Sequence, residues 1–428
     1  MAEDTVGVPV EVDREVPGLI VKFGTYPLHH GGVGAIRSLG RLGVPMYAIT
    51  EDPYTPAAAS RYLRRAFVWP TTGAEDPGRL VEGLLRIGRR IGRPAVLIPT
   101  DEEAAVLIAE HRDALAGPFL CPRVDPALPR RVASKQGLHE LCEEHGQGLA
   151  SPAAAFPRSY EEVVAFADTA SFPVVAKNRE AFLRRSRPAV GGTTRIATRA
   201  GLLALAREWG PDPGVILQEY LPREQAEDWI VHACFDRDAN PLALFTGVKV
   251  RSWPPHAGMT AHAYAVDNPE LADLAARFVK RIGFSGVADL DLRHDRRDGR
   301  YKLLDFNPRM GAQFRLFESA AGVDVVRALH LDLTGRPVPE GEQRAGRRYV
   351  VENIDLPALL AYRRGGYTTP HAPARASGTE LAWFAGDDPL PFLTMLARFV
   401  RPGARHLRQL WRAHRRGVTD RAARQHTS

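Results

Sequence analysis

The sequence predicts an α/β domain built on a parallel sheet, then an α+β region and a mostly helical C-terminal extension. In the first third, the apolar runs 18–23, 44–49 and 95–99 fit buried strands. Between them lie segments whose apolar residues recur at helical spacing, such as 80–91. Strands separated by helices of this length indicate a parallel sheet with helices packed on it. Later strands follow one another closely, which indicates antiparallel hairpins; they are expected at 172–177, 215–220, 229–235, 242–250, 288–292 and 301–306.

Length, charge and cysteine content restrict the class of protein. A chain of 428 residues is too long for one ordinary core, so two or three packed units are expected. The net charge of +7 suits a phosphate-bearing ligand, but much of the excess arginine lies in the tail, and we expect no nucleic-acid partner. The cysteines lack metal-ligand spacing and no segment has the uncharged length of a membrane span. Because no basic patch precedes an apolar run near Met1, we expect a cytoplasmic protein.

A glycine-rich stretch, His-His-Gly-Gly-Val-Gly at 29–34, follows the first expected strand as a loop. It lacks the ending of a P-loop and is no full dinucleotide fingerprint. Ligands of parallel sheets bind at the carboxyl ends of strands, so His30, Gly31, Gly32 and Asp101 lie where a substrate could sit. A tight turn that needs small residues explains the glycines equally well.

The most informative segment is 287–309, which has the pattern of a hairpin. Alternate residues of a strand share a face, so Asp289 lies with Asp291 and Asp305 lies with Asn307. Pairing of the two strands would bring these oxygen atoms together, and Mg²⁺ binds a few protein oxygens and completes its shell with phosphates and water. Burying several carboxylates without a cation would be costly. The hairpin therefore predicts a magnesium site.

This hairpin resembles the metal-binding end of the ATP-grasp superfamily, where an acidic residue on one strand precedes a Glu-x-Asn on the next. Asp291, Asp305 and Asn307 match the three metal ligands, and Arg309 matches an arginine that often follows them. Asp305 stands where the family has glutamate, which shortens the reach to the metal by one methylene group. Whether one or two metal ions bind therefore stays open.

Upstream motifs resemble the nucleotide-binding parts of the same superfamily, in the same order. Lys135 and Lys177 match the lysines that contact nucleotide phosphates, 190–195 resembles the glycine-rich lid, and 216–221 resembles the hinge that holds adenine. The residues that this resemblance assigns to ATP binding are Lys135, Lys177, Gly191, Gly192, Thr193, Gln218, Glu219, Tyr220, Leu221 and Asp228. Asp228 is expected near the ribose, although a turn cap explains it equally well.

The resemblance covers roughly residues 18–335 and implies a domain order. We expect an N-terminal α/β (pre-ATP-grasp) domain at 1–130, joined by a Pro-rich linker to an ATP-grasp domain at 131–335, then an extension at 336–428. The ATP-grasp domain would have a lid lobe at about 131–212 and a metal-binding lobe at about 213–335. The tail at 391–416 predicts a basic amphipathic helix that docks on the body or on a second subunit, and the latter would allow a homodimer. Alternatively, this helix lies on an anionic membrane surface.

The resemblance implies an ATP- and Mg²⁺-dependent carboxylate–amine ligase that forms an acyl phosphate and releases ADP and phosphate. Its substrates would be small molecules, an amino acid or small acid and an amine. Arg309 is expected to clamp a carboxylate or an oxyanion, while Lys249 and Arg251 are expected on one strand face beside the acceptor site. A plain surface loop is the alternative there. Two other functions stay open: a carboxylase-like enzyme using bicarbonate, and a nucleotide-binding regulatory protein without turnover.

Overall fold

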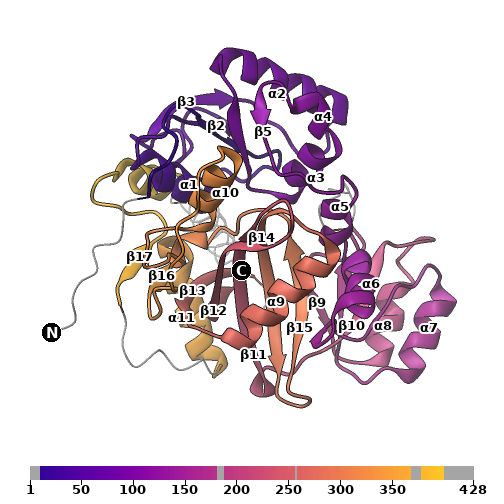
Figure 1. The fold of residues 1–428 in the computed structure, drawn as a ribbon. Coiled ribbons are helices and arrows are strands. Elements are labelled where there is room, and N and C mark those ends of the chain that lie inside the picture. The colour runs from indigo at the N-terminus through magenta and orange to yellow at the C-terminus, as the bar shows by residue number, and fades with distance from the viewer. Residues whose placement is uncertain (1–9, 181–187, 256–257, 368–376, 400–428) are drawn as a thin grey trace, which may run out of the picture.

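The N-terminal part of the chain forms a parallel sheet. The computed structural model describes residues 10–180, 188–255, 258–367 and 377–399. The sheet has the order β3-β2-β1-β4-β5, and each neighbouring pair is parallel, as predicted (Figure 1). Its elements are β1 (Gly18–Val21), α1 (His30–Gly40), β2 (Met46–Thr50), β3 (Leu63–Val68), α2 (Pro77–Ile91), β4 (Ala95–Pro99), α3 (Glu102–Glu110), α4 (Arg112–Leu115) and β5 (Phe119–Leu120).

The glycine-rich stretch does not form the expected loop, because it lies in the first turns of α1. His29 caps this helix, and its Nδ1 atom accepts a hydrogen bond from the Gly32 N–H at 3.0 Å. A Cβ atom on Gly31 would lie 2.8 Å from the Cα atom of Ala312, so glycine allows the helix to pack closely. Asp101 likewise caps α3. These residues therefore have structural roles here.

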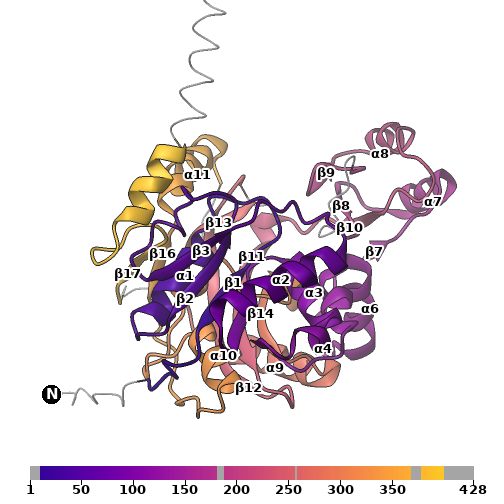
Figure 2. The same cartoon turned by 90° about the horizontal axis from the view of Figure 1, so that it is seen from above.

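A small antiparallel sheet stands apart from the N-terminal one, in the order β7-β10-β8-β9. Apolar side chains of its strands pack against α7 and α8, which cover one face. Figure 2 shows these two helices at one end of the molecule, with α11 at the other. The elements are β7 (Ala154–Ala155), α7 (Tyr160–Thr169), β8 (Val174–Asn178), β9 (Thr194–Ile196), α8 (Arg199–Ala206) and β10 (Val215–Glu219).

The central sheet has the order β17-β16-β13-β12-β11-β14-β15-β6, and its inner pairs are antiparallel. Helices α6 and α9 cover one face, while α1 and α10 pack on the other. The elements are α5 (Leu128–Ala133), α6 (Lys135–His145), β6 (Leu149–Ala150), β11 (Ala226–Phe235), β12 (Pro241–Trp253), β13 (Met259–Ala265), α9 (Pro269–Ile282), β14 (Gly286–Asp295), β15 (Arg300–Asn307) and α10 (Val325–Leu333), with short 3₁₀ turns at Arg223–Gln225 and Phe314–Leu316. The mixture of parallel and antiparallel sheets agrees with the predicted fold class.

The prediction of a mostly helical C-terminal extension is not confirmed for the described residues. Besides α11 (Glu352–Gly365) and a helix at 390–399, the extension contributes β16 (Arg348–Val350) and β17 (Thr379–Leu381) to the central sheet. The arginine-rich tail from residue 400 onward lies outside the described residues. Among the described residues, no helix is long and apolar enough to cross a membrane. The domain boundaries given above stay predictions.

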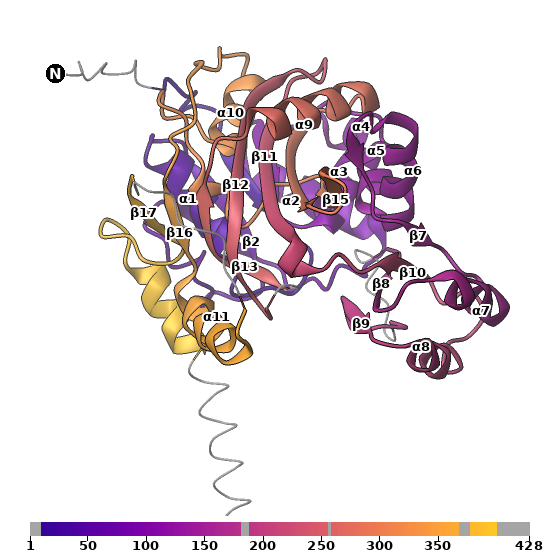
Figure 3. The same cartoon turned by 90° about the horizontal axis from the view of Figure 1, so that it is seen from below.

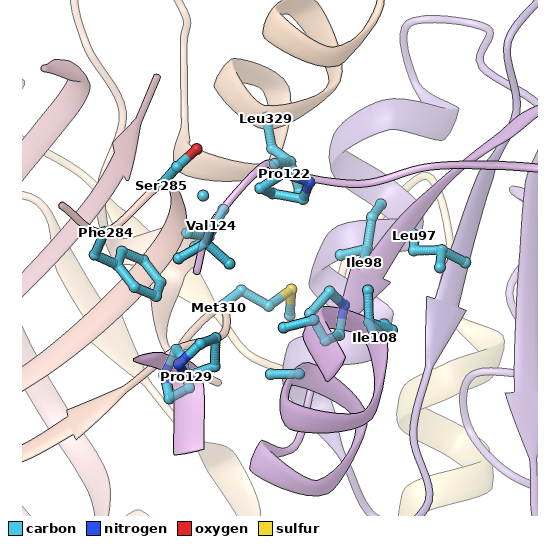
Figure 4. A pocket seen from close by; sticks show the side chains of 16 residues that line it. Leu97, Ile98, Ile108, Pro122, Val124, Pro129, Phe284, Ser285, Met310 and Leu329 are labelled. Carbon is cyan, nitrogen blue, oxygen red and sulfur yellow. The ribbon is translucent and has the colours of Figure 1, made fainter. Parts of the chain in front are cut away.

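The N-terminal sheet meets the central sheet along an apolar interface, shown in Figure 4. A small pocket there is lined by side chains from β4 and α3 on one side, and from α10 and the loops around β14 and β15 on the other; these include Leu97, Ile98, Ile108, Phe284, Met310 and Leu329. Met310 directly follows Arg309, so this interface holds the loop after β15 against the N-terminal sheet. The packing thereby fixes the end of the hairpin that carries the acidic residues.

Candidate active site

A cleft opens between the small sheet and the central sheet, and it gathers most of the predicted binding residues. Figure 3 shows strands β8, β9 and β10 of the small sheet beside the central sheet. It contains ≈ 990 Å³ of space, part of it open to solvent. The predicted residues that line it are Lys177, Thr193, Gln218, Glu219, Tyr220, Leu221, Asp228, Lys249, Asp291 and Asp305. The fold therefore brings together segments that are more than a hundred residues apart in the sequence.

The β14–β15 hairpin places its polar residues on one face, as predicted. Asp291 is paired with Asp305 across the two strands, and Asp289 is paired with Asn307. The alternate residues, such as Leu290, lie in the core under α6 and α9, which fixes the opposite face as the polar one. Burial raises the pKa of Asp291, and the nearby carboxylates of Asp289 and Asp305 raise it further, although Lys249 opposes them.

Three lysines surround these carboxylates. Lys135, at the start of α6, binds the Asp305 carboxylate, and Lys249 lies 2.5 Å from Asp291. Lys177, on β8, lines the cleft, and burial lowers its pKa while Asp305 counteracts this shift. For Asp305 itself burial opposes ionisation, but Lys135 and Lys177 outweigh it and lower the pKa. The cleft thus holds positive charge beside the acidic face, the combination that binds phosphate and a divalent cation.

The oxygen atoms available on this face suit a magnesium ion. The Oδ1 atom of Asp291 is buried, and its contact is the ion pair with Lys249 at 2.5 Å. The Asn307 side-chain amide donates to the Asp289 carbonyl at 3.1 Å, which leaves its own oxygen without a hydrogen bond among the described residues. Those residues contain no cluster of three or more His, Cys, Asp or Glu arranged to hold a metal. The donors present are two carboxylates and one amide oxygen, a set that a hard cation can use when its remaining ligands come from phosphates and water.

In the hinge segment, the protein itself binds one of the polar side chains that the sequence analysis assigned to the nucleotide. Gln218 is buried, lines the cleft, and has no side-chain hydrogen bond to the described residues. The Glu219 carboxylate, in contrast, accepts hydrogen bonds from Lys302 at 2.9 Å, from Arg297 at 3.0 Å and from the Ala153 N–H at 3.1 Å. The protein itself fixes the Glu219 side chain, so Gln218 and the backbone after Glu219 remain to contact a base.

Two arginines that the sequence analysis did not assign to the site also line the cleft. Arg293, on β14, binds Asp228 at 2.6 Å, and Arg195, on β9, lies 5.0 Å from the centre of the Tyr220 ring. Arg293 follows Asp291 by two positions, so strand alternation was a signal that could have identified it. Asp228, expected near a ribose, is held by this arginine.

The glycine-rich stretch expected to form a lid, 190–195, lies within the described residues, whereas the basic stretch that precedes it, at 181–187, lies outside them. Gly192 has a φ of +85°, a conformation that favours glycine. A Cβ atom on Gly191 or Gly192 would meet nothing within 4 Å, so close packing does not explain these glycines. Thr193, the next residue, lines the cleft.

Arg309 does not line the cleft, because it lies in a second charged group against the N-terminal sheet. Its guanidinium donates to the Asp289 carboxylate at 2.9 Å and to the Glu102 carboxylate at 2.8 and 3.1 Å. The buried His232 ring lies 3.1 Å from Asp289. Burial opposes ionisation of Asp289, but His232 and Arg309 outweigh it and lower its pKa. A substrate carboxylate could therefore reach the fork of Arg309 only by displacing Glu102.

Arg251 and Lys249 do not share a strand face as expected, because the pairing of β12 with β13 shifts register between them. Lys249 reaches the cleft, whereas Arg251 donates two hydrogen bonds to Asp355 of α11, at 2.9 and 3.0 Å. A third contact joins Arg251 to His262 Nδ1 at 2.6 Å. Arg251 therefore links the central sheet to the C-terminal extension and does not border the cleft.

Comparison with known proteins agrees with this architecture. No known protein-family profile matches the chain. Over 288 residues the chain is 25% identical to a D-aspartate ligase of Enterococcus faecium (strain Aus0004), a match that covers 63% of this chain and 67% of that protein.

Two solved structures share the fold. An N5-carboxyaminoimidazole synthetase of Staphylococcus aureus, complexed with ADP, matches with a TM-score of 0.57 at 11% identity, over 84% of this chain and 87% of that chain. The biotin carboxylase domain of the Hydrogenobacter thermophilus 2-oxoglutarate carboxylase matches with a TM-score of 0.54 at 15% identity, over 78% of this chain and 72% of that chain. The chain shares the fold of these ATP-grasp enzymes, and its similarity to the D-aspartate ligase agrees with the resemblance to the carboxylate–amine ligase branch.

Proposed function

We propose that the chain is an ATP- and Mg²⁺-dependent ligase that joins a carboxylate to an amine through an acyl phosphate. The observation that carries this proposal is one cleft lined by Lys177, Lys249, Asp291 and Asp305, with Lys135 bound to Asp305. Cations on one side and carboxylates on the other suit the triphosphate of a nucleotide and its metal ion.

The printed descriptions of proteins with this fold support the nucleotide. The Staphylococcus aureus synthetase was solved with ADP, and the Hydrogenobacter thermophilus domain with MgADP and bicarbonate. In this chain, Lys135 and Lys177 would hold the phosphates, and Gln218 with the following backbone would hold the base. Asp291, Asp305 and Asn307 would hold Mg²⁺, which neutralises phosphate charge when bound.

In the proposed reaction, an oxygen of the substrate carboxylate forms a bond to the γ-phosphorus as the bond to ADP breaks. The amine nitrogen then bonds to the acyl carbon, phosphate leaves, and the amine loses a proton to phosphate or solvent. Lys177 and Lys249 would stabilise the negative charge that spreads over the transferred phosphoryl oxygens. The loop around Gly191 and Gly192 would exclude water, which otherwise hydrolyses an acyl phosphate.

The acid is proposed to be an amino acid or a similarly small acid. The name of the Enterococcus faecium relative specifies D-aspartate, which supports an amino acid here. The role first assigned to Arg309, clamping a carboxylate or an oxyanion, requires that Glu102 release the guanidinium. Glu102→Gln should therefore alter the KM for the acid more than the KM for ATP, because it weakens the competing contact.

ADP release, measured with ATP, Mg²⁺ and panels of amino acids, tests the proposal. In the presence of hydroxylamine, a ligase yields a hydroxamate of its acid, whereas a nucleotide-binding regulatory protein yields neither hydroxamate nor ADP. A carboxylase-like enzyme would release ADP only when bicarbonate is present. Absence of acid-dependent ADP release across the panel would contradict the ligase proposal.

A further inference from the structure

A second groove lies on the N-terminal sheet, between the edge strand β3 and helix α2. It contains ≈ 1190 Å³ of space, part of it open to solvent, and none of its lining residues belongs to the nucleotide cleft. A Cβ atom on Gly83 of α2 would lie 2.0 Å from the Trp69 ring, so this ring lies directly against the helix. The groove is thus lined by the aromatic ring of Trp69, which packs on Gly83.

Four arginines line this groove without an acidic partner. Arg65 comes from β3, and Arg86, Arg89 and Arg90 come from α2; all four are exposed. Within the described part of the chain, no carboxylate lies within ion-pair distance of any of them, and Arg65 instead lies 5.2 Å over the Phe67 ring. Four guanidinium groups around one groove repel each other, so an anionic occupant would be attracted to it.

Some surface arginines elsewhere have carboxylate partners: Arg112 pairs with Asp113, and Arg130 pairs with Glu110 at 2.6 Å. Others, such as Arg363 and Arg364, have no carboxylate partner among the described residues, but they do not gather around a groove with two further arginines. Arg89 and Arg90 lie in the last turn of α2, where positive charge is stabilised by the helix dipole, and this alone explains their presence. It does not explain Arg65 or Arg86. The groove is therefore more basic than helix stabilisation requires.

The backbone of β3 adds a second feature. This strand ends the sheet order and pairs only with β2 among the described residues. An edge strand leaves N–H and C=O groups on its outer side, and these can pair with an added strand. Arg65 and Phe67 alternate along the strand and Trp69 directly follows its end, and all three border the groove.

We propose that this groove docks an extended acidic segment of a partner protein, which adds to β3 as a further strand. Alternate Asp or Glu side chains of the segment would lie against Arg65, Arg86 and Arg90, where arginine can bind carboxylates in bidentate fashion. A second copy of this chain is a poor occupant, because the two basic grooves would repel each other across a two-fold axis. The inference is independent of the ligase proposal.

Fluorescence anisotropy tests the docking with a labelled peptide of about ten alternating Glu and Val residues, long enough to span one strand. Saturable binding is expected, and the double charge reversal Arg86→Glu with Arg90→Glu should weaken it by about tenfold or more. The matched control is Arg363→Glu with Arg364→Glu, which changes two exposed arginines in the last turn of α11 and should leave the affinity unchanged. Equal loss in both variants would overturn the proposal, since it would indicate a response to net charge alone.

A second peptide, with the same charge but with alternate valines replaced by proline, tests the strand geometry. Each proline lacks a backbone N–H and has a fixed φ, which interrupts the regular hydrogen bonding of an added strand, so weaker binding than the first peptide is expected. Equal binding of the two peptides would overturn strand addition. Tighter binding of oligothymidylate, or of vesicles that contain phosphatidylglycerol, would also overturn the proposal and assign the groove to another class of polyanion. Thermal melting of each variant confirms that it is folded.

Discussion

The nucleotide cleft and the C-terminal seam both bury charged side chains, but they partner these charges differently. The C-terminal seam is the contact of α1 and its neighbours with residues 383–398. In it Asp388 accepts hydrogen bonds from Arg37 at 3.0 Å and from Ser60 at 2.7 Å, and both the arginine and the aspartate are almost fully buried. In the cleft, Asp291 is held by an ion pair with Lys249 at 2.5 Å, and open space adjoins it.

This difference teaches that burial of charge alone does not identify a functional site. The seam satisfies its charges within the protein, so its contribution is to the stability and docking of the C-terminal segment. The cleft places Asp291, Asp305, Lys177 and Lys249 around a space that the protein does not fill, with Lys135 bound to Asp305. Substitutions in the cleft should therefore change binding and turnover, whereas substitutions in the seam should change the free energy of unfolding.

The largest effect is expected from Asp305→Asn, which removes a charge from the cleft and keeps the shape. Mg²⁺-dependent ADP release should fall by about a thousandfold, on the scale of losing a main electrostatic contact in a transition state. The melting temperature should change little, and Asp305→Glu should retain activity because it restores the side-chain length usual in the superfamily. Activity like that of the wild type in Asp305→Asn would refute the metal assignment.

Asp388→Asn tests the seam. It leaves the buried guanidinium of Arg37 without its counter-charge, so the free energy of unfolding should fall by about 3 kcal/mol in denaturant titrations. Nucleotide affinity should be unchanged. The neighbouring Asp387→Asn is the matched control, because its partner Arg41 is more exposed and the loss should be below about 1 kcal/mol. Equal losses in the two variants would show that burial of the ion pair does not decide how much free energy of unfolding it contributes.

A smaller effect is expected from Lys177→Ala, which removes one phosphate contact. The affinity for ATP should weaken by about 2 kcal/mol, the scale for a charge-assisted hydrogen bond in a partly buried site. Calorimetry measures this, with Lys280→Ala as the control, because Lys280 is an exposed lysine whose contacts lie at Asp238 and Asn240. An unchanged affinity in Lys177→Ala would mean that the lysine does not touch the nucleotide.

Local patterns predicted much of the fold. Ser134, a residue type typical of helix N-caps, directly precedes α6, which begins at Lys135, and the hairpin predicted at 287–309 pairs Asp291 with Asp305. Both depend on neighbours in sequence, namely a cap and the alternation of residues along a strand. The cleft followed from motifs whose order matched that of a known superfamily.

Features that depend on distant residues were not predictable in this way. Glycines at 31–34 indicated a loop, but they serve helix packing against a segment near Ala312. The fork of Arg309 is filled by Glu102, which is some two hundred residues away in the chain. A bulge in β12 separates Arg251 from Lys249, and no periodicity in the sequence marks that bulge. Assignment of individual residues to the site stays a prediction until it is measured.

Hydrogen exchange, with and without a non-hydrolysable ATP analogue and Mg²⁺, tests the central claim most directly. Nucleotide should protect amides in β8, in the stretch from 188 to 196 and in the hinge at 215–221, because these segments surround the cleft or lie at its edge. Amides of α1 and of 383–398 should exchange at unchanged rates, since the seam has no place for the ligand. Protection confined to the seam, or no protection of β8 and the hinge at saturating nucleotide, would contradict the account.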